Sequence, residues 1–575
     1  MKRARSTPGQ RGSTPGNLDP RPGKDRSAPG HGGFEPRRQA GSSPGRSSRL
    51  TTYRLDANAS GAIKTIHNIA NLTVVSSDAN DLKAEYRAGF VQGKLQGKTI
   101  LSARDNSWDN AYLTNPSHTF PKQHGPAQGP TQAELNEAAD LLNANYAAFL
   151  GYLVAPATDA DTTCHLKRLL FRMLGIYHGV SLDTPADLDF SGEWLPDSNY
   201  FQASELTLGY ETAGLTFMDV YFLNAYNDFM DVVSFSVERA PGGIRPGDHP
   251  DRCSAFLKRS GNEVILTHNS WMGFLSQTVT QTLAVNGDLV TFNAATPGLI
   301  GSATDFGYNN KGIMFNETTH RLTQSQVKPL GLWIFWRAAL AEQFSGSIAD
   351  FFDAISLDNT GTYLNGYMVV DAKTNEAGLV EMSDRCFVYY HSGGGPYTVT
   401  SKSLDGGACS TDYDTEMVTA DYLMGINYPA SLQVRADLKS SDNRPARRQQ
   451  FNQLLPGVND VETAKTAITY TDPANPLSVF GRWDLGYGQT PSPKQIPDGS
   501  VDSKVASTSM VRSFMGLSGS LDTKSPATGF WMLYGTPSVN GTPFIWSQSS
   551  WKWQKLRDVP DRLDGRFTLM PVYLR

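Results

Sequence analysis

A hairpin that begins at a cysteine constrains this chain more than any other stretch. Two β-prone runs, 253–259 and 264–271, flank the turn-forming sequence Ser-Gly-Asn-Glu. Because paired residues mirror each other about a turn, we expect Cys253 to lie opposite residues 269–271. The preceding segment 241–250 is rich in Pro and Gly and predicts irregular structure. A linker therefore ends where a buried strand begins, and Cys253 stands at the junction.

The position of Cys253 suits a chain that cleaves itself. Its thiol could attack the carbonyl carbon of Arg252, and hydrolysis of the resulting thioester would leave Cys253 as a new N-terminus. The freed α-amine, whose ordinary pKa is about 8, could then serve as the base that activates the thiol. A lone cysteine is more often a small buried hydrophobic residue, so the hairpin alone leaves both interpretations open.

Motifs spread over residues 80–575 resemble the phospholipase B-like family of the N-terminal nucleophile hydrolases. Residues 253–255 (Cys-Ser-Ala) and 268–271 (His-Asn-Ser-Trp) are similar to that family's Cys-Ser-Ala and His-Asn-Thr-Trp. Residues 359–371 resemble its Asn-Ser-Gly-Thr-Tyr-Asn-Asn-Gln-Trp-Met-Ile-Val-Asp, with departures at Leu364 and Gly366. Shorter matches follow in the same order along the chain at 85–93, 223–228, 296–298, 305–306, 317–319, 499–505 and 543–547.

The resemblance implies an α+β fold, an αββα four-layer sandwich of the N-terminal nucleophile hydrolase type with helical additions. It divides the folded chain into a smaller chain, 51–252, and a catalytic portion, 253–575, which stay associated after self-cleavage. Residues 1–50 are a separate tail with 7 Pro, 9 Gly, one aromatic residue and a net charge of +8. Such a basic Pro/Gly/Ser-rich composition predicts disorder.

Apolar spacing and turn residues indicate where the regular elements lie. Helices are expected over 81–95, 132–154, 164–176, 215–233 and 332–340. Strands are expected within 65–75, 288–293, 312–318, 367–371 and 378–382. In the first helix, Gly89 and Gly93 are small residues suited to close packing. Periodicity alone predicts only a mixed α and β protein.

The resemblance also assigns the residues of a site. The expected catalytic residues are Cys253, His268, Asn365 and Thr319. The expected substrate-binding residues are Trp271, Asn269 and Thr318, and the expected cleavage site is Arg252 and Cys253. Two carboxylates, Asp305 and Asp371, are expected to be structural.

Each expected role has a structural alternative. Cys253 is the expected nucleophile, and Asn365 is the expected oxyanion donor because an amide can hold negative charge without titrating. Asn365 could equally be a turn residue, and His268 could be a core histidine that closes a strand. Thr319 could donate its hydroxyl to a substrate carbonyl or merely end a strand, whereas Trp271 is expected to form a pocket wall.

The resemblance implies that the protein is a hydrolase that removes fatty acyl chains from phospholipids by cleaving ester bonds. The alternatives are an amidase acting on N-acyl substrates and a protein that binds lipid or a partner without turnover. No metal or other cofactor is expected, because the four cysteines form no Cys-x-x-Cys pair. A net charge of −5 indicates no nucleic-acid partner, and no apolar run is long enough for a transmembrane segment.

The cellular location stays open at this point. Family members carry a secretory signal peptide, so the resemblance implies a secreted or lysosome-like protein, whereas residues 1–49 have no apolar signal region. Either the protein stays inside the cell or its true start lies elsewhere. On a secretory route, Cys386 and Cys409 are the nearest candidates for a disulfide besides Cys253, although connectivity cannot be read from sequence. Glycosylation sequons would then begin at Asn58, Asn71, Asn316 and Asn540.

Overall fold

The computed structural model describes most of the chain after the basic tail. The described residues are 50–114, 129–156, 158–237, 253–273, 277–302, 305–320, 327–440, 445–472, 478–481, 498–517, 519–535, 544–548, 557–563 and 565–575. The chain divides into two units, Met1–Ser47 and Ser48–Arg575, and all described residues belong to the second. The disorder predicted for the tail therefore falls outside the described residues, apart from Leu50.

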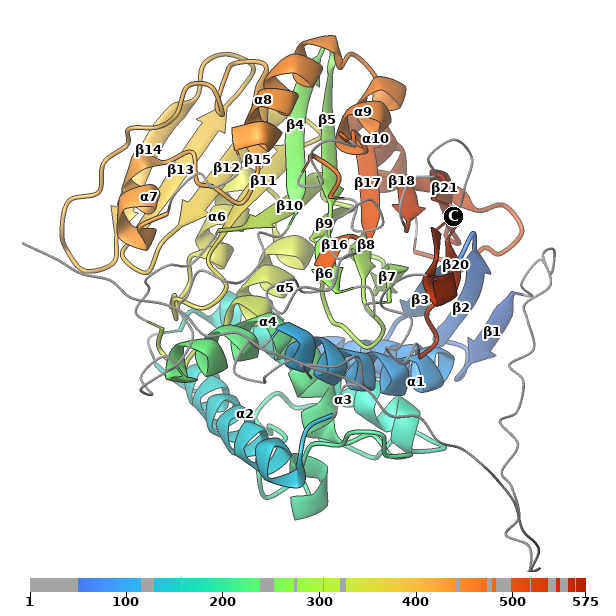
Figure 1. Ribbon diagram of the computed structural model, residues 1–575. Coiled ribbons are helices and arrows are strands. Elements are labelled where there is room, and N and C mark those ends of the chain that lie inside the picture. Colours follow the sequence, from blue (N-terminus) through green and yellow to red (C-terminus); the bar gives the residue numbers. More distant parts are fainter. Residues whose placement is uncertain are drawn as a thin grey trace, which may run out of the picture. The chain divides into compact units, whose positions relative to one another are not determined.

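An eleven-stranded sheet forms the centre of the second unit (Figure 1). Its strands, in spatial order, are β1 (Thr51–Arg54), β2 (Ala59–Ile66), β3 (Ile69–Ser76), β7 (Val279–Val285), β8 (Leu289–Ala295), β9 (Phe306–Asn309), β10 (Ile313–Thr319), β11 (Asn365–Asp371), β12 (Glu376–Met382), β13 (Cys386–Ser392) and β14 (Thr398–Ser403). Among these described strands, β3 and β7 pair in parallel and every other neighbouring pair is antiparallel.

A second, six-stranded sheet carries the predicted hairpin. Its strands, in spatial order, are β15 (Tyr422–Gly425), β4 (Ser254–Ser260), β5 (Glu263–Asn269), β17 (Asp502–Ser507), β18 (Ala527–Tyr534) and β21 (Thr568–Val572). Two short ribbons complete the strands of the described chain, namely β6 (Trp271–Gly273) with β16 (Asp498–Ser500), and β19 (Phe544–Ile545) with β20 (Arg562–Leu563).

The two large sheets pack against each other through aromatic residues. The ring of Phe530 on β18 lies 4.5 Å from that of Phe292 on β8 and 5.1 Å from that of Phe306 on β9, centroid to centroid. Gly529 permits this approach, because a Cβ there would lie 2.2 Å from the Phe292 ring. A polar contact also joins the sheets, since Asn316 Nδ2 donates to the Thr267 carbonyl at 2.8 Å.

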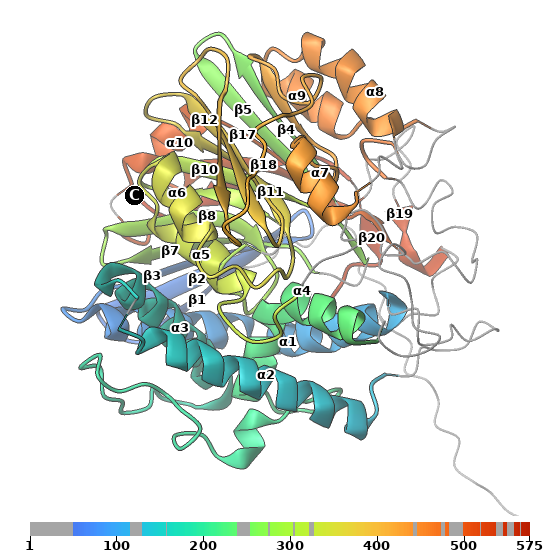
Figure 2. The ribbon, with the colours of Figure 1, turned by 90° about the vertical axis from the view of Figure 1, so that its left-hand side faces the viewer.

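Helices cover the outer faces of both sheets (Figures 1 and 2). On the larger sheet lie α1 (Asp81–Thr114), α5 (Ile334–Phe344) and α6 (Ile348–Ile355), with α2 (Gln132–Leu153), α3 (Ala160–Ser181) and α4 (Phe217–Val237) packed around them. Next to the smaller sheet are α8 (Pro445–Leu454), α9 (Val461–Ile468) and α10 (Thr508–Met515), whereas α7 (Leu432–Leu438) contacts β13 of the larger sheet. Three short 3-10 helices are η1 (Ala203–Leu206), η2 (Leu455–Gly457) and η3 (Trp546–Gln548). The predicted α+β sandwich is therefore confirmed.

Helix α1 is longer than predicted and packs tightly against α3. The prediction ended at residue 95, but the helix continues to Thr114. A Cβ on Gly89 would lie 2.1 Å from the Arg172 carbonyl oxygen, and one on Gly93 would lie 2.4 Å from that of Ile176. The close packing predicted from these two glycines is confirmed.

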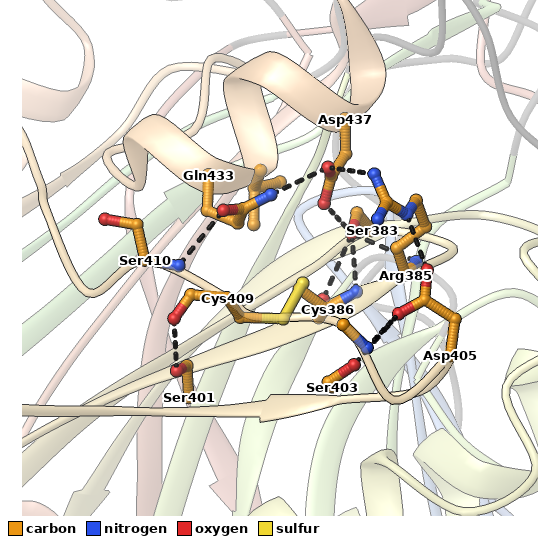
Figure 3. Close-up of a disulfide and its surroundings, with 12 residues drawn as sticks. Ser383, Arg385, Cys386, Ser401, Ser403, Asp405, Cys409, Ser410, Gln433 and Asp437 are labelled. Atoms are coloured by element: carbon orange, nitrogen blue, oxygen red, sulfur yellow. Dashed lines mark hydrogen bonds and ion pairs between the residues drawn. A yellow bond between two sulfur atoms is a disulfide. The ribbon is translucent and has the colours of Figure 1, made fainter.

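A disulfide joins Cys386, at the start of β13, to Cys409 (Figure 3). The bond closes a sequence separation of 23 residues, and Cys386 is buried. Neighbouring polar contacts hold the same region, including the ion pair of Arg385 with Asp405 at 2.9 Å. The pair that the sequence offered as nearest is therefore the bonded one, while Cys164 and Cys253 are free thiols.

We expect removal of this disulfide to lower the free energy of unfolding by about 2–4 kcal/mol, because the cross-link restricts the unfolded chain. Urea unfolding of the Cys386→Ser/Cys409→Ser protein would measure the loss, in a Cys253→Ala background that excludes the self-cleavage expected from the sequence. Cys164→Ser, which alters an exposed thiol, is the matched control. A double variant as stable as this control would contradict the prediction.

Candidate active site

The predicted hairpin is confirmed as the pair β4–β5. Its register runs from Ser254 opposite Asn269 to Ser260 opposite Glu263. Gly261 in the turn has a φ of 56°, a left-handed conformation that glycine adopts without strain. At the open end, the Ser254 backbone N–H donates to Asn269 Oδ1 at 2.8 Å. Cys253 therefore stands one residue before the first pair, as the sequence predicted.

Cys253 is held in a strained backbone conformation. Its φ is 76°, a region that residues with a side chain occupy only when their surroundings impose it, at a cost of roughly 1–3 kcal/mol. The buried guanidinium of Arg447 donates to the Cys253 carbonyl at 2.7 Å and to Ser254 Oγ at 3.2 Å. Arg252, the other half of the predicted cleavage site, lies outside the described residues.

Three further side chains converge on the thiol. Atoms of Cys253, His268, Asp305 and Glu317 that could bind a metal all lie within 4.8 Å of one another. The predicted proximity of His268 to Cys253 is confirmed, and its chemical role stays a prediction. Asp305, expected to be structural, belongs to this cluster and has a φ of 54°, whereas Asp371 caps a turn by accepting from the Lys373 N–H at 2.8 Å.

The surroundings keep the thiol in its protonated form. Burial raises the pKa of the Cys253 thiol well above its usual value, and the carboxylates of Glu317 and Asp305 raise it further. Burial also lowers the pKa of His268 well below its usual value, and the Lys504 ammonium lowers it further. A neutral thiol beside a neutral imidazole is a weak nucleophile.

A buried ion pair lies next to the hairpin end. Lys504 and Asp502 have fully buried side chains, and Lys504 Nζ lies 2.6 Å from Asp502 Oδ1. Lys504 Nζ also donates to Ser270 Oγ at 2.6 Å, and the Ser270 N–H donates to Asp502 Oδ1 at 3.0 Å. Because β17 pairs with β5, Lys504 stands directly opposite His268. The ion pair holds Ser270 at the end of β5, and the Lys504 ammonium disfavours the protonated form of the His268 imidazole.

Arg447 and Asn427 are site residues that sequence reasoning missed. Arg447 Nη1 donates to Asn427 Oδ1 at 3.0 Å, and Asn427 Nδ2 donates to the Thr319 carbonyl at 2.7 Å. This chain of contacts connects Cys253 to Thr319 across the two sheets. The signal available in the sequence was weak, since Arg447 lies 194 residues after Cys253 in a segment with no distinctive pattern.

The remaining predicted catalytic residues lie side by side on the larger sheet. Thr319, the last residue of β10, stands opposite Asn365, the first residue of β11. Neither Thr319 Oγ1 nor Asn365 Oδ1 has a hydrogen-bond partner among the described residues, although both atoms are buried. Asn365 Nδ2 donates to the Tyr367 hydroxyl at a long 3.4 Å. Both side chains are thus available to a further ligand.

The predicted substrate-binding residues are buried and engaged in the fold. Asn269 Nδ2 donates to the carbonyls of Ile468 and Val479 at 3.1 and 2.9 Å, so its amide holds three backbone groups in all. Trp271 has no exposed area, and the Arg447 guanidinium lies 5.2 Å from its ring centre. Thr318 packs against Gly425. Their contact with a substrate stays a prediction.

A small cavity borders the cluster on the helix side of the larger sheet. Its volume is about 50 Å³, room for one or two water molecules. Asp305 contributes to both the cavity and the cluster, and the cavity is also lined by Asp228, Glu342, Tyr363 and Tyr367.

Glu381 anchors the loop that carries Asn427. Its carboxylate accepts hydrogen bonds from the N–H groups of Ala430 and Ser431, both at 2.6 Å. Burial raises the pKa of Glu381 from 4.5 to about 7. His320 Nε2 lies 3.7 Å away, and burial lowers the pKa of His320 to about 3, so the histidine stays neutral near pH 7.

We expect Glu381→Gln to flatten the pH dependence of stability. Because folding raises the pKa of Glu381, protonation favours the folded state, and this stabilisation is lost as the pH rises from 4.5 through about 7. The loss is about 3 kcal/mol and is absent from a glutamine, which does not titrate. Urea unfolding at several pH values, with both proteins in a Cys253→Ala background, measures it. If the free energy of unfolding changed equally with pH in the Glu381→Gln protein and in the protein that retains Glu381, the prediction would be contradicted.

Two of the four sequons are unsuited to glycosylation in the folded chain. Asn71 and Asn316 have no exposed area, and both side chains donate hydrogen bonds to backbone carbonyls. Asn58 is exposed, and Asn540 lies outside the described residues. The interpretation of Asn71 and Asn316 as glycosylation sites is therefore wrong for the folded chain.

Among the described helices, none combines the length and the apolar character needed to cross a bilayer.

Comparison with known proteins agrees with the geometry. A family model described as Phospholipase B matches residues 198–570, a span that holds the hairpin, the cluster and Arg447. Phospholipase B-like protein C of Dictyostelium discoideum is 23% identical over 400 residues, covering 61% of this chain and 66% of the relative. Phospholipase B of Crotalus adamanteus is 26% identical over 400 residues, covering 62% and 66%. Phospholipase B-like 1 of Homo sapiens is 25% identical over 195 residues, covering 31% and 35%.

These matches span about two thirds or less of each relative. The family model, in contrast, covers well over half of this chain and includes every predicted site residue. The chain therefore belongs to the phospholipase B family.

Proposed function

We propose that this protein is a self-cleaving hydrolase of acyl ester bonds whose nucleophile is Cys253. The observation that carries the proposal is the state of Cys253, a strained and buried thiol at the start of a strand and beside His268. In the first step the sulfur attacks the Arg252 carbonyl carbon, and the peptide nitrogen leaves as the Cys253 amine. Water then hydrolyses the thioester and releases the Arg252 carboxylate. The two product chains together contain all atoms of the original chain plus those of one water molecule.

Cleavage supplies the base that the uncut site lacks. The thiol is protonated before cleavage because burial raises its pKa. A new α-amine on Cys253 can accept the thiol proton as the sulfur attacks a substrate carbonyl. Water resolves the acyl-thioester and returns the proton to the site. The Thr319 hydroxyl has no partner among the described residues, and Asn365 Nδ2 makes only a long contact of 3.4 Å to the Tyr367 hydroxyl, so an O–H and an N–H donor are available here for a substrate carbonyl oxygen.

The substrate class rests on the relatives. Proteins named phospholipase B and phospholipase B-like match most of the chain, so a phospholipid acyl ester is the substrate proposed here. An N-acyl amide is attacked by the same steps. The non-catalytic alternative is a protein that binds lipid or a partner without turnover.

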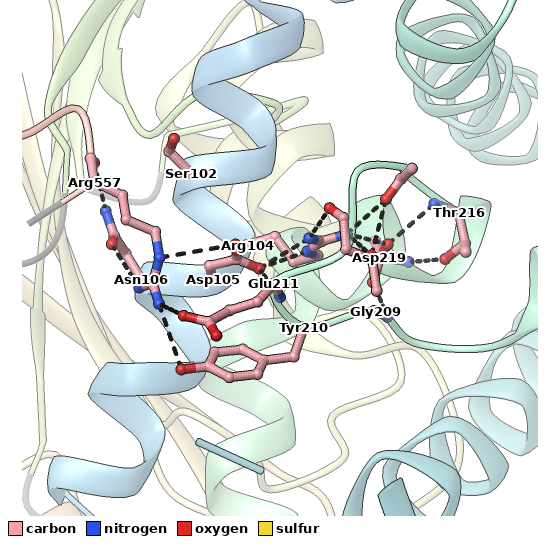
Figure 4. A network of polar contacts seen from close by, with 12 residues as sticks. Ser102, Arg104, Asp105, Asn106, Gly209, Tyr210, Glu211, Thr216, Asp219 and Arg557 are labelled. Carbon is pink, nitrogen blue, oxygen red and sulfur yellow. Dashed lines mark hydrogen bonds and ion pairs between the residues drawn. The ribbon is translucent and has the colours of Figure 1, made fainter. Parts of the chain in front are cut away.

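The architecture supports association of the two chains after cleavage. The smaller chain contributes β1, β2 and β3 to the larger sheet, and β3 pairs with β7 over seven residues from Ala70 opposite Val279 to Ser76 opposite Val285. Arg557, from the catalytic portion, lies 2.6 Å from Glu211 of the smaller chain (Figure 4). It also lies 2.5 Å from Asp109 of the smaller chain. Separation would expose an unpaired sheet edge and leave buried charges unpaired.

Purified protein is expected to consist of two chains that elute together in gel filtration and separate only in denaturant. N-terminal sequencing of the larger chain should read Cys-Ser-Ala-Phe. Phospholipid esters and N-acyl amides are then offered to this cleaved protein in parallel assays. A fully active protein that remains one uncut chain would refute the maturation step. Correctly cleaved protein that hydrolyses neither substrate would favour the binding protein.

A further inference from the structure

Four potential metal ligands from distant parts of the chain meet beside the thiol. The Cys253 sulfur, a His268 nitrogen and one carboxylate oxygen each of Asp305 and Glu317 lie within 4.8 Å of one another. All four residues are more than nine-tenths buried. Neither ring nitrogen of His268 makes a hydrogen bond of good geometry to a described residue, although the Glu317 backbone lies nearby. The imidazole is thus turned into the cluster without a strong partner there.

The spacing suits a small divalent cation. In a tetrahedral zinc site, bonds of about 2.0–2.3 Å place the ligand atoms roughly 3.4–3.8 Å apart. Contraction from 4.8 Å or less requires each atom to move by less than roughly 1 Å. A thiolate, an imidazole and two carboxylates form a mixed set that zinc accepts, whereas Mg²⁺ and Ca²⁺ prefer oxygen ligands alone.

The fold fixes the backbone around these ligands. Arg447 holds the Cys253 carbonyl at 2.7 Å, and the Glu317 N–H donates to the Asp305 carbonyl at 3.3 Å. His268 stands opposite Ala255 in the β4–β5 register. Two ligands therefore come from the hairpin of the smaller sheet and two from the β9–β10 end of the larger sheet. Preorganised ligands of this kind lower the cost of ordering a metal site.

We propose that Cys253, His268, Asp305 and Glu317 bind Zn²⁺ and that the bound ion blocks the thiol. Binding breaks the S–H bond, sends the proton to solvent and forms a Zn–S bond, with no change in oxidation state. The sulfur electron pair is then engaged and cannot attack a carbonyl carbon. Metal binding follows from the geometry alone, whereas the block of cleavage and turnover also rests on the proposed function. Zinc is thereby a reversible inhibitor of this site.

Co²⁺, which can replace zinc, reports the ligands directly through the absorption of a thiolate–cobalt bond. Titration of the full chain with Co²⁺ is expected to produce this absorption, and added Zn²⁺ should remove it. Cys253→Ala should lose it entirely, while Cys164→Ala, which alters the other free cysteine, should keep it. Glu317→Gln and Asp305→Asn each remove a proposed metal ligand and should lower the affinity for Co²⁺. Loss of a residue that merely hydrogen-bonds a ligand costs ~10–100-fold in metal affinity, so the loss of a ligand should cost more.

Circular dichroism of each variant distinguishes loss of a ligand from loss of the fold. If Glu317→Gln does not fold, Asp305→Asn serves as the test of the carboxylate ligands. No absorption in the wild-type chain, or equal absorption in Cys253→Ala, would overturn the metal site. The inhibitory part is tested by self-cleavage and acyl hydrolysis with Zn²⁺ and then with a chelator. Zinc that binds through Cys253 but leaves both rates unchanged would overturn inhibition and leave the site intact. A chain that never cleaves still reports binding, so the two proposals fail separately.

Discussion

Replacement of Cys253 by alanine is expected to abolish both self-cleavage and turnover. Alanine has no atom that can attack a carbonyl carbon, and no other free thiol lies in the described cluster, since Cys164 belongs to α3. Loss of a nucleophile in acyl-transfer enzymes lowers kcat by on the order of 10⁶. Intact mass should show a single uncut chain, and hydrolysis of a phospholipid ester should fall to background.

Two variants make this result interpretable. Cys253→Ser keeps a nucleophilic oxygen, so slow cleavage over hours is expected where alanine shows none. Cys164→Ala removes the exposed free thiol and should cleave and turn over like the wild type. Thermal unfolding should confirm that Cys253→Ala remains folded. Acyl hydrolysis by Cys253→Ala at the wild-type rate would exclude the thiol mechanism.

The hairpin could be predicted because its information is local. β4, the turn and β5 are contiguous, and alternation plus a Gly/Asn turn determines their register. Trp271 is also local to the hairpin, since only Ser270 separates it from the end of β5. Asn365 and Thr319 came from motif resemblance, and their adjacency on β10 and β11 agrees with that source without testing their roles.

The polar half of the site depends on contacts that no local pattern encodes. Arg447 reaches Cys253 across 194 residues, and Asp305 reaches His268 only because the two sheets stack. A metal site was not expected because the ligands follow no short spacing, and such clusters appear only once the fold is known. An isolated arginine in a polar segment gives the same sequence signal whether it is exposed or, like Arg447, buried.

The end of α1 was missed for a related reason. Beyond residue 95 the apolar stripe is sparse, because its buried members Ile100, Ala103, Trp108 and Ala111 stand among Gln, Lys, Arg, Asp and Asn residues. Its polar residues are nevertheless buried and paired, as Arg104 with Asp219 at 3.1 Å and Asp105 at 2.9 Å shows (Figure 4). Buried polar residues that hydrogen-bond to one another cannot be distinguished, from the sequence alone, from polar residues on a solvent-exposed surface.

Asn365→Ala is expected to lower kcat and kcat/KM together by about 10²–10³, with KM little changed, because an oxyanion donor acts mainly in the transition state. Asn365 Nδ2 makes only a long contact to the Tyr367 hydroxyl, at 3.4 Å, so an N–H is available for a developing negative charge. The amide of Asn427, in contrast, is engaged at both ends with Thr319 and Arg447. Steady-state kinetics on fully cleaved protein measures the effect.

Asn427→Ala is the matched comparison for this prediction. Because Asn427 positions Arg447, and Arg447 holds the Cys253 carbonyl, we expect its loss to slow self-cleavage first. N-terminal sequencing before kinetics separates failed maturation from failed catalysis. A cleaved Asn365→Ala enzyme with normal kcat would remove Asn365 from the oxyanion hole and make it a structural residue at the start of β11. If cleaved Asn427→Ala then lost kcat by ~10²–10³ instead, the second amide of this site would be the donor.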